Sequence, residues 1–243
     1  MSEPPRAPRG SVTLIVPTYN EITGMRAIMP QIRPEWCDQI IVVDAGSTDG
    51  TQDYARAQGY ELVMQKTPGL RPAYVEAFSH ARGDIVVTFS PDGNSLPELI
   101  PALVDKVDRG YDMVIASRYA PGAKSDDDDW LTAFGNWMFT RLINLCFRAH
   151  YTDSIVMFRA YRTKLFWELE LDRDEGYAME KLFLTTIGVE PLLSIRAAKR
   201  RLKVGDIPGD EPARLGGARK LLPFRWGAAF LLQIAREMYY WRR

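Results

Sequence analysis

The chain has 243 residues, 46% of them hydrophobic, which is enough to bury one substantial core. Lys and Arg together number 31, as do Asp and Glu, so the formal net charge is zero and no nucleic-acid partner is expected. No apolar run reaches the roughly 18 to 20 residues that a membrane span needs, which argues against a membrane-spanning protein.

The cysteines and the first residues indicate the compartment. Cys37 and Cys146 fit neither a metal-binding spacing nor a disulfide framework, and the start of the chain has no apolar targeting segment. We therefore expect a cytoplasmic protein, either soluble or peripheral on the cytoplasmic face of a membrane. Residues 196–243 carry 12 Lys and Arg against 4 Asp and Glu, so this basic end either faces something anionic or balances the acidic remainder.

Short β-branched runs alternate with longer amphipathic segments in the first half of the chain. The expected strands cover 12–16, 39–43, 61–64, 85–89 and 113–117, and the expected helices cover 22–32, 51–58, 73–81 and 97–107. Strict alternation predicts an α/β fold, Rossmann-like, with a mostly parallel central sheet and helices on both faces.

The alternation stops after Arg118. Helices are expected at 130–147, 176–187 and 224–243, and a strand at 202–207; the segment up to Arg201 is basic. Residues 126–129 are four consecutive aspartates, which we interpret as a solvated loop and as favourable charge at a helix N-terminus. Metal binding is the weaker interpretation, because four adjacent side chains do not all point at one ion.

The first strand is followed by Pro17, Tyr19 and Glu21. Proline donates no ladder hydrogen bond, so Pro17 is expected to turn the chain outward at the carboxyl edge of the sheet. Tyr19 is then placed to stack on a nucleobase. The alternative is a simple strand-to-helix turn in which Asn20 caps the helix.

The second strand ends at Asp44, followed by Ala45, Gly46 and Ser47. Asp44 is placed to accept hydrogen bonds from a base or a ribose, and Gly46 allows a ligand to approach the backbone. Asp49 is interpreted as a helix cap rather than a ligand contact.

Oxygen-bearing side chains alternate after the fourth strand, at Ser90, Asp92 and Asn94. Hard oxygen donors of this kind bind Mg²⁺ or Mn²⁺. The carboxyl ends of strands are also where open α/β sheets place their ligands. The pattern predicts a site for one small cation.

Three motifs together carry a family resemblance: Pro17-x-Tyr19-Asn20-Glu21, Asp44-x-Gly46-Ser47-x-Asp49-Gly50-Thr51, and the Asp92 loop. Over about the first 120 residues they resemble the donor half of family-2 glycosyltransferases with the GT-A fold. The resemblance implies a UDP- or GDP-linked sugar bound by Pro17, Tyr19, Glu21, Asp44 and Asp92, with Mg²⁺ or Mn²⁺ as cofactor.

The second half is similar to one subgroup, the dolichol-phosphate mannose synthases and bacterial polyprenyl-phosphate glycosyltransferases. The shared motifs are Ala116-Ser117-Arg118-Tyr119, the segment 158–162 after Asp153, and Arg214-x-x-Gly217-x-x-Lys220. This resemblance implies inverting transfer to a polyprenyl (dolichyl or undecaprenyl) phosphate. It also implies that cations hold the donor and acceptor phosphates, namely Arg118, Arg214, Arg219 and Lys220.

One departure from the family pattern falls on the metal loop, where Ser90 replaces the first of two aspartates. A cation held by Asp92, Asn94 and Ser90 would depend more on the diphosphate of the donor.

Asp153 has two open roles: general base for a hydroxyl acceptor, or orientation of Arg159 or Arg162. A phosphomonoester acceptor, with a second pKa of about 6, needs no such base at neutral pH. The residues expected to take part in catalysis are Asp92, Arg118 and Asp153.

The expected domain organisation follows from these elements and motifs. Residues 1–10 would form a flexible tail, 11–223 one domain with a nucleotide-sugar half (11–120) and an acceptor half (121–223), and 224–243 an amphipathic helix. That helix either contacts a membrane surface or docks on its own domain or on a partner. The alternative functions are transfer to a soluble hydroxyl acceptor and an inactive nucleotide-sugar-binding scaffold. The sequence indicates no oligomeric state.

Overall fold

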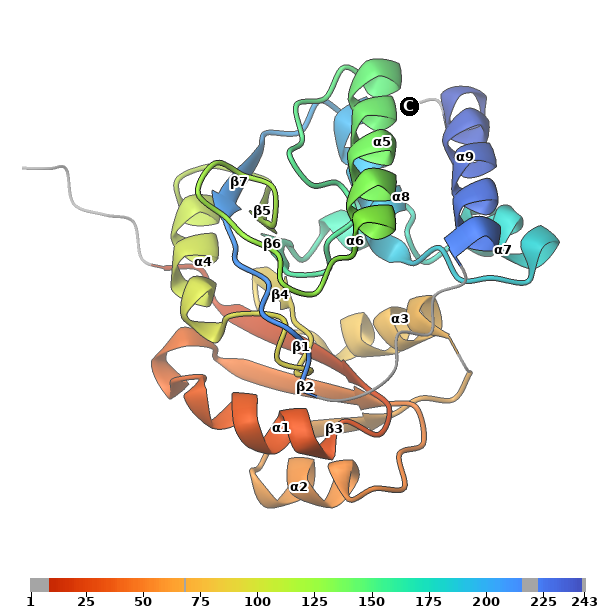
Figure 1. Cartoon of the computed structure of the whole chain (residues 1–243). Helices are drawn as coiled ribbons and strands as arrows, with labels where there is room; N and C mark the ends of the chain where they lie inside the picture. Colours follow the sequence, from red (N-terminus) through yellow and green to blue (C-terminus); the bar gives the residue numbers. More distant parts are fainter. Residues whose placement is uncertain (1–8, 68, 216–222, 242–243) are drawn as a thin grey trace, which may run out of the picture.

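A seven-stranded sheet with the order β3-β2-β1-β4-β6-β5-β7 forms the centre of the molecule (Figure 1). The computed structural model describes residues 9–67, 69–215 and 223–241. The strands are β1 (Val12–Thr18), β2 (Gln39–Asp44), β3 (Glu61–Met64), β4 (Ile85–Thr88), β5 (Met113–Ser117), β6 (Arg159–Arg162) and β7 (Val204–Pro208). The β6 strand runs antiparallel to β4 and β5, whereas the other pairings are parallel. The expected mostly parallel sheet is confirmed.

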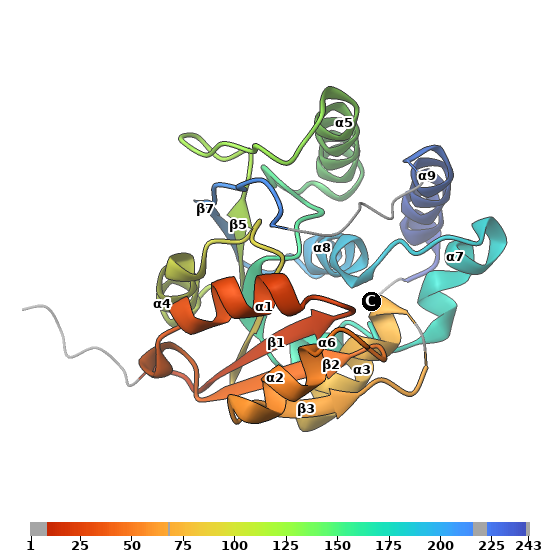
Figure 2. The same ribbon diagram turned by 60° about the horizontal axis from the view of Figure 1, so that its bottom comes forward.

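Helices cover both faces of this sheet (Figures 1 and 2). They are α1 (Ile22–Ile28), α2 (Thr51–Ala57), α3 (Leu70–His80), α4 (Ile100–Asp108), α5 (Trp130–Phe147), α6 (Leu165–Glu168), α7 (Ala178–Phe183), α8 (Val189–Lys199) and α9 (Pro223–Tyr239). Short 3₁₀ turns occur at η1 (Met29–Gln31), η2 (Pro34–Trp36), η3 (Pro97–Leu99) and η4 (Asp174–Tyr177). One apolar cluster lies under α1, α2 and α4, and the other lies under α3, α5, α6, α8 and α9.

The central strands are hydrophobic on both sides because both sides are covered. In β1, Leu14 and Val16 belong to one cluster while Ile15 belongs to the other, and all three are fully buried. The expected outward turn at Pro17 is corrected, because Pro17 and Thr18 continue β1 alongside Val43 and Asp44 of β2. This continuation is tolerated because β4 pairs with β1 only as far as Ile15, so Pro17 lies beyond that ladder.

Three elements of the second half were not predicted, namely β6, the single-turn helix α6 and α8. The β6 strand carries arginine at both ends, so it lacks a strand-like apolar run, yet Arg159 is fully buried and bonds Ser194 Oγ at 3.0 Å. The α8 helix is buried from Val189 to Ala197, so it shows no amphipathic period. In addition, the helix expected to reach 187 ends at Phe183, because Leu184 adopts a left-handed conformation with φ 48°.

The C-terminal helix α9 docks on its own domain through one face. Its Glu237 forms an ion pair of 3.3 Å with Arg196 of α8, and both side chains are almost completely buried. Trp226, Phe230 and Ile234 are buried on the same side of α9. The docking interpretation is therefore confirmed for this face.

The opposite face of α9 is apolar and exposed. It holds Ala228, Leu231, Ala235 and Met238, which recur at helical spacing. Throughout the part of the chain that the structure describes, no helix combines the length and the apolar character needed to cross a bilayer.

The buried ion pair predicts that α9 is needed for stability. Glu237→Gln leaves the Arg196 guanidinium buried without its counter-charge, so we expect a loss of about 3 kcal/mol in the free energy of unfolding. Urea unfolding at neutral pH measures this loss. Glu168→Gln is the matched control, because its ion pair with Lys164 is half-exposed and the expected change is under about 0.5 kcal/mol. Equal midpoints for the two variants would contradict the account.

Candidate active site

The turn after β1 is fixed by bonds to the neighbouring β2–α2 loop. The backbone N–H of Asn20 donates to Ser47 Oγ (2.8 Å), and that of Ile22 donates to Asp49 Oδ2 (3.0 Å). The N-cap position of α2 is Gly50 rather than Asp49, but the Asp49 carboxylate accepts from the first backbone N–H of both α1 and α2, those of Ile22 and Thr51. Tyr19 remains 48% exposed at this edge, while the expected cap, Asn20, instead accepts a bond from Thr48 N.

Asp44 is fully buried at the end of β2 and holds its own loop together. Its carboxylate accepts hydrogen bonds from the hydroxyl of Thr18 (2.9 Å), the backbone N–H of Gly46 (3.0 Å) and Ser47 (2.8 Å), and the amide of Gln52 (2.9 Å). Direct contact of Asp44 with a nucleotide stays a prediction. Its structural role is to shape the loop that borders the site.

The loop after β4 carries Asp92, which is 5% exposed. Two glycines bring other segments against it: a Cβ on Gly24 of α1 would lie 2.1 Å from the carbonyl oxygen of Pro91, and one on Gly93 would lie 2.6 Å from Leu215. The backbone N–H of Leu215 also donates to the carbonyl of Asp92 (2.9 Å). The loop is therefore held between α1 and the segment after β7.

Arg118, just after β5, lies among three carboxylates. Its guanidinium contacts Asp153 (2.7 Å), Glu211 (3.4 Å) and Asp128 (3.6 Å), and its side chain is 11% exposed. Asp153 is fully buried and also accepts bonds from Asn136 and from two backbone N–H groups.

The alternative in which Asp153 orients Arg159 or Arg162 is wrong. Its arginine partner is Arg118, whereas Arg159 bonds Val156 O and Ser194, and Arg162 bonds Val107 O.

Arg214 forms ion pairs both with the metal loop and with the run of four aspartates at 126–129. Its guanidinium lies 3.2 Å from Asp92 Oδ2 and 3.1 Å from Asp127 Oδ2. The other two expected phosphate-binding cations, Arg219 and Lys220, lie outside the described residues.

A cavity of about 320 Å³ collects these groups at the carboxyl edge of the sheet. Its lining includes six of the twelve expected site residues: Glu21, Ser90, Asp92, Asn94, Arg118 and Arg214. Pro17, Tyr19, Asp44 and Asp153 are not among its lining residues. The structure thus brings the metal loop and two of the four expected cations to one cavity.

The pKa values of Asp153 and Glu211, two carboxyl groups beside Arg118, are shifted in opposite directions. Burial alone would raise the pKa of Asp153, but the charge and hydrogen bonds of Arg118, together with hydrogen bonds from Asn136 and from the backbone N–H of Ile155, hold that pKa below its usual value. Burial raises the pKa of Glu211, and Asp128 and Asp127 add to this effect against the opposing charge of Arg118. Asp153 is therefore a fixed anion, and Glu211 is the carboxyl that neutralises more readily.

Sequence reasoning missed the partners that hold the two arginines. Asp129 does cap α5, accepting from Thr132 N at 2.8 Å, so it places negative charge at the helix N-terminus as expected. However, Asp127 and Asp128 are not solvated, because they pair with Arg214 and Arg118. Neither Glu211 nor Asn136 lies in a sequence pattern that predicts its role.

The metal loop offers one carboxylate with a hydroxyl and an amide nearby. Among residues 9–67, 69–215 and 223–241, no group of three or more His, Cys, Asp or Glu side chains is arranged to hold a metal ion. The oxygen donors Ser90, Asp92 and Asn94 fit a hard divalent cation only if a ligand supplies further oxygens.

A mostly parallel sheet with an acidic loop and two arginines over one cavity at its carboxyl edge is consistent with the GT-A fold. A family model described as glycosyl transferase family 2 matches residues 13–170. The chain therefore belongs to glycosyl transferase family 2 and is a hexosyltransferase of that family, as its motifs suggested.

Curated relatives are similar along most of the chain. It is 32% identical over 190 residues to an undecaprenyl-phosphate mannosyltransferase of Micrococcus luteus, covering 72% of this chain and 77% of that one. It is 29% identical over 220 residues to a dolichyl-phosphate hexose transferase of Haloferax volcanii, covering 90% of each.

A solved structure confirms the fold. Glucosyl-3-phosphoglycerate synthase from Mycobacterium tuberculosis, in complex with Mn²⁺, UDP and phosphoglyceric acid, superposes with a TM-score of 0.68. The match covers 96% of this chain and 80% of that one at 21% identity, so it bears on the fold alone.

Proposed function

We propose that this protein transfers a hexosyl group from a UDP- or GDP-linked sugar to a polyprenyl phosphate, with inversion at the anomeric carbon. The observation that carries the proposal is that Arg118 and Arg214 line the same cavity as Asp92, while the candidate base Asp153 is fixed by Arg118. The names of the two curated relatives support a lipid-linked phosphate acceptor.

The acceptor chemistry agrees with this cluster. A phosphomonoester, with a second pKa of about 6, is largely a dianion at neutral pH and attacks without losing a proton to the enzyme. It needs a cation to position it, and arginine suits a bidentate phosphate contact. Arg118 would supply that contact. The acceptor phosphate would replace Glu211 beside the guanidinium, since the raised pKa of Glu211 means that this carboxyl becomes neutral more readily.

The donor side rests on the Asp92 loop. Asp92, with Ser90 and Asn94, would hold Mg²⁺ or Mn²⁺ together with the diphosphate of the donor. When bound, such an ion neutralises charge on the departing nucleoside diphosphate. Arg214 pairs with Asp92 and lies where it would contact the same phosphates. Tyr19, Glu21, Pro17 and Asp44 would border the nucleoside, with Tyr19 stacking on the base.

Membrane contact through α9 is part of the proposal. Its buried face holds the domain, and its exposed apolar face, which includes Leu231 (42% exposed) and Met238 (45% exposed), would meet the bilayer that contains the acceptor. The cations of the basic C-terminal region favour an anionic membrane surface.

An acceptor panel tests the function. The full chain is incubated with UDP- and GDP-hexoses, with Mg²⁺ or Mn²⁺, and with either undecaprenyl phosphate, dolichyl phosphate or 3-phosphoglycerate. We expect a polyprenyl-phosphate hexose, identified by mass spectrometry, and no product from 3-phosphoglycerate. Product from 3-phosphoglycerate alone would establish a hydroxyl acceptor instead. Donor binding without hydrolysis or transfer would establish a binding protein.

A further inference from the structure

A second cavity, of about 1090 Å³, lies between the C-terminal ends of α5 and α8 and the start of β7. Ligand cavities commonly measure about 300 to 1,000 Å³, so this one has room for a molecule of nucleotide size. Part of its lining is apolar, and the rest includes four basic side chains. The apolar residues include Cys146, Phe147, Leu202 and Val204, and the basic ones are Arg148, His150, Lys199 and Arg201.

The second cavity and the active-site cavity lie at opposite ends of β7 and α5. The β7 strand starts at Val204 in the second cavity, and the segment that follows its other end carries Glu211 into the active-site cavity. The α5 helix ends at Phe147 in the second cavity and begins near Asp128, which pairs with Arg118. The two sets of lining residues do not overlap. A ligand in the second cavity therefore leaves the active-site residues available.

Two arginines of the lining have backbone conformations that arginine rarely adopts. Arg148 ends α5 with φ 55°, and Arg201 follows α8 with φ 53°. Helices commonly end on a residue in this left-handed conformation, but that residue is usually glycine, because a side chain there is strained. Among the described residues, five other than glycine have a positive φ, and two of them are these arginines. Strained residues gather at sites that bind ligands, so the pair indicates a binding role.

The charges of Arg148 and Arg201 are not neutralised by any residue that the structure describes. Neither side chain makes a hydrogen bond or an ion pair within the described ranges. The described lining holds one carboxyl group, that of Asp206, and burial raises its pKa, so it becomes neutral more readily. Each of the two helix C-termini adds about half a negative charge. The three permanent cations of the lining outweigh these negative charges, so the cavity attracts anions.

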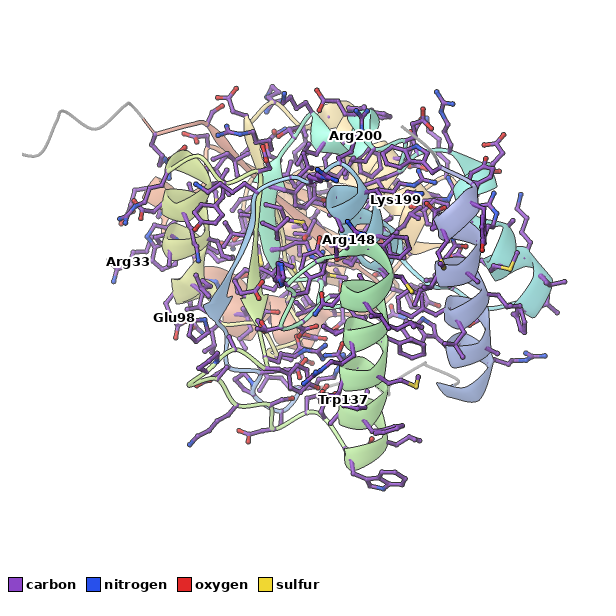
Figure 3. The ribbon with its side chains drawn as sticks, turned by 90° about the horizontal axis from the view of Figure 1, so that it is seen from above. Arg33, Glu98, Trp137, Arg148, Lys199 and Arg200 are labelled. Carbon is purple, nitrogen blue, oxygen red and sulfur yellow. The ribbon has the colours of Figure 1, made fainter. Side chains whose placement is uncertain are left out.

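We propose that this second cavity binds a soluble organic phosphate, that is, a small phosphorylated molecule with an apolar or aromatic part. The guanidinium groups of the two arginines suit bidentate contact with a phosphate. The apolar side chains of Phe147 and Val204 suit the rest of such a molecule. Figure 3 labels Arg148 at the end of α5, and Lys199 and Arg200 at the end of α8. This site goes beyond the proposed transfer reaction, which does not use the second cavity.

Labelling of Cys146 tests binding at this cavity directly. Cys146 lines the cavity, whereas the other cysteine, Cys37, is buried, and burial raises the pKa of its thiol to about 12, so it stays unreactive. The full-length protein is treated with N-ethylmaleimide at increasing concentrations of phenyl phosphate, and modification of Cys146 is followed by mass spectrometry. We expect phenyl phosphate to slow the labelling in a saturable manner. Phenol, which lacks the anion, and inorganic phosphate, which lacks the ring, should protect at much higher concentrations only.

Glycine substitutions remove the two cations without endangering the fold. Arg148→Gly and Arg201→Gly introduce the residue that the left-handed conformation favours, so the urea midpoint of the double variant should be unchanged or higher. The half-protecting concentration of phenyl phosphate should rise roughly tenfold or more, because charge-assisted hydrogen bonds are lost. Leu184→Gly is the matched control, because it replaces another left-handed residue, at the end of α7, and keeps both arginines. It should be protected like the wild type.

Three results would overturn the proposal. They are the absence of protection of the wild type by phenyl phosphate, equal protection of the wild type and the double variant, and equal protection by phenol or by inorganic phosphate. Without added phenyl phosphate, sugar transfer should be the same in the wild type and the double variant, because neither arginine lines the active-site cavity. If no polyprenyl phosphate accepts sugar while arginine-dependent protection of Cys146 persists, the proposed function fails and this binding site stands.

Discussion

Asp92→Asn is expected to lower kcat for sugar transfer by about 1,000-fold with little change in stability. Asp92 supplies the single carboxylate of the metal loop, because Ser90 occupies the other position, and it also pairs with Arg214. The substitution therefore removes the charge that would hold the divalent cation beside the departing diphosphate. Steady-state rates at saturating donor and Mn²⁺, with and without EDTA, measure the effect.

Two comparisons sharpen this prediction. Asp53→Asn changes an aspartate whose side chain is 88% exposed on α2, and it should leave kcat unchanged. EDTA should suppress the wild-type rate and add little to the loss in Asp92→Asn. A variant that retains a near-normal, EDTA-sensitive rate would remove Asp92 from the metal site.

Arg118→Met is expected to affect both stability and activity. The side chains of Asp153, Asp128 and Glu211 are 0%, 3% and 8% exposed, and the substitution leaves all three without the cation they share. We expect a loss of about 3 to 5 kcal/mol in the free energy of unfolding. We also expect kcat/KM for the acceptor to fall by roughly 100-fold or more, because the cation that positions its phosphate is lost.

The pH dependence of this loss has a defined sign. In the wild type, Arg118 and the other hydrogen-bond donors together overcome burial and depress the pKa of Asp153. The contribution of Asp153 to stability is therefore present above its unfolded pKa of about 3.9 and is lost as pH falls through the folded value. In Arg118→Met, burial is opposed only by the hydrogen bonds from Asn136 and from the backbone, so the pKa of Asp153 is higher than in the wild type. The stability difference between the two proteins should therefore shrink as pH falls from neutral towards about 5.

A double variant separates stability from catalysis. Arg118→Met/Asp153→Asn removes both charges of the closest pair, so it should recover much of the lost stability while transfer stays low. Chemical denaturation and acceptor kinetics on the same preparations decide this. Recovery of transfer together with stability would mean that Arg118 acts only through the fold.

The first half of the fold was predictable because its strands are buried on both faces. Runs such as 14–16 and 40–43 are continuous and hydrophobic, and the turns that follow them are distinctive. The β6 strand could not be found in this way, because Arg159 is buried by hydrogen bonds rather than by apolar character. Its antiparallel insertion between β4 and β5 depends on contacts between distant segments.

The loops of the site were predictable from the sequence, whereas the ion pairs between its side chains were not. The Asp92 loop, Arg118 and Arg214 meet at one cavity, as the motif order implied. The partners of the arginines come from 10 or more residues away in the chain, with Asp128 at the start of α5 and Glu211 after β7. Local patterns carry no information on such pairs, so residues that looked like solvated charge turned out to hold the two cations in place.

The central claim is that the acceptor phosphate itself is the nucleophile, positioned by Arg118 and unaided by a side-chain base. The most direct test is the pH profile of kcat/KM for a polyprenyl phosphate and for the matching difluoromethylene phosphonate, whose second ionisation occurs at lower pH. We predict that the acidic limb of the profile moves to lower pH with the analogue, following the acceptor. An acidic limb that stays in place for both acceptors would assign the ionisation to the enzyme and contradict the account.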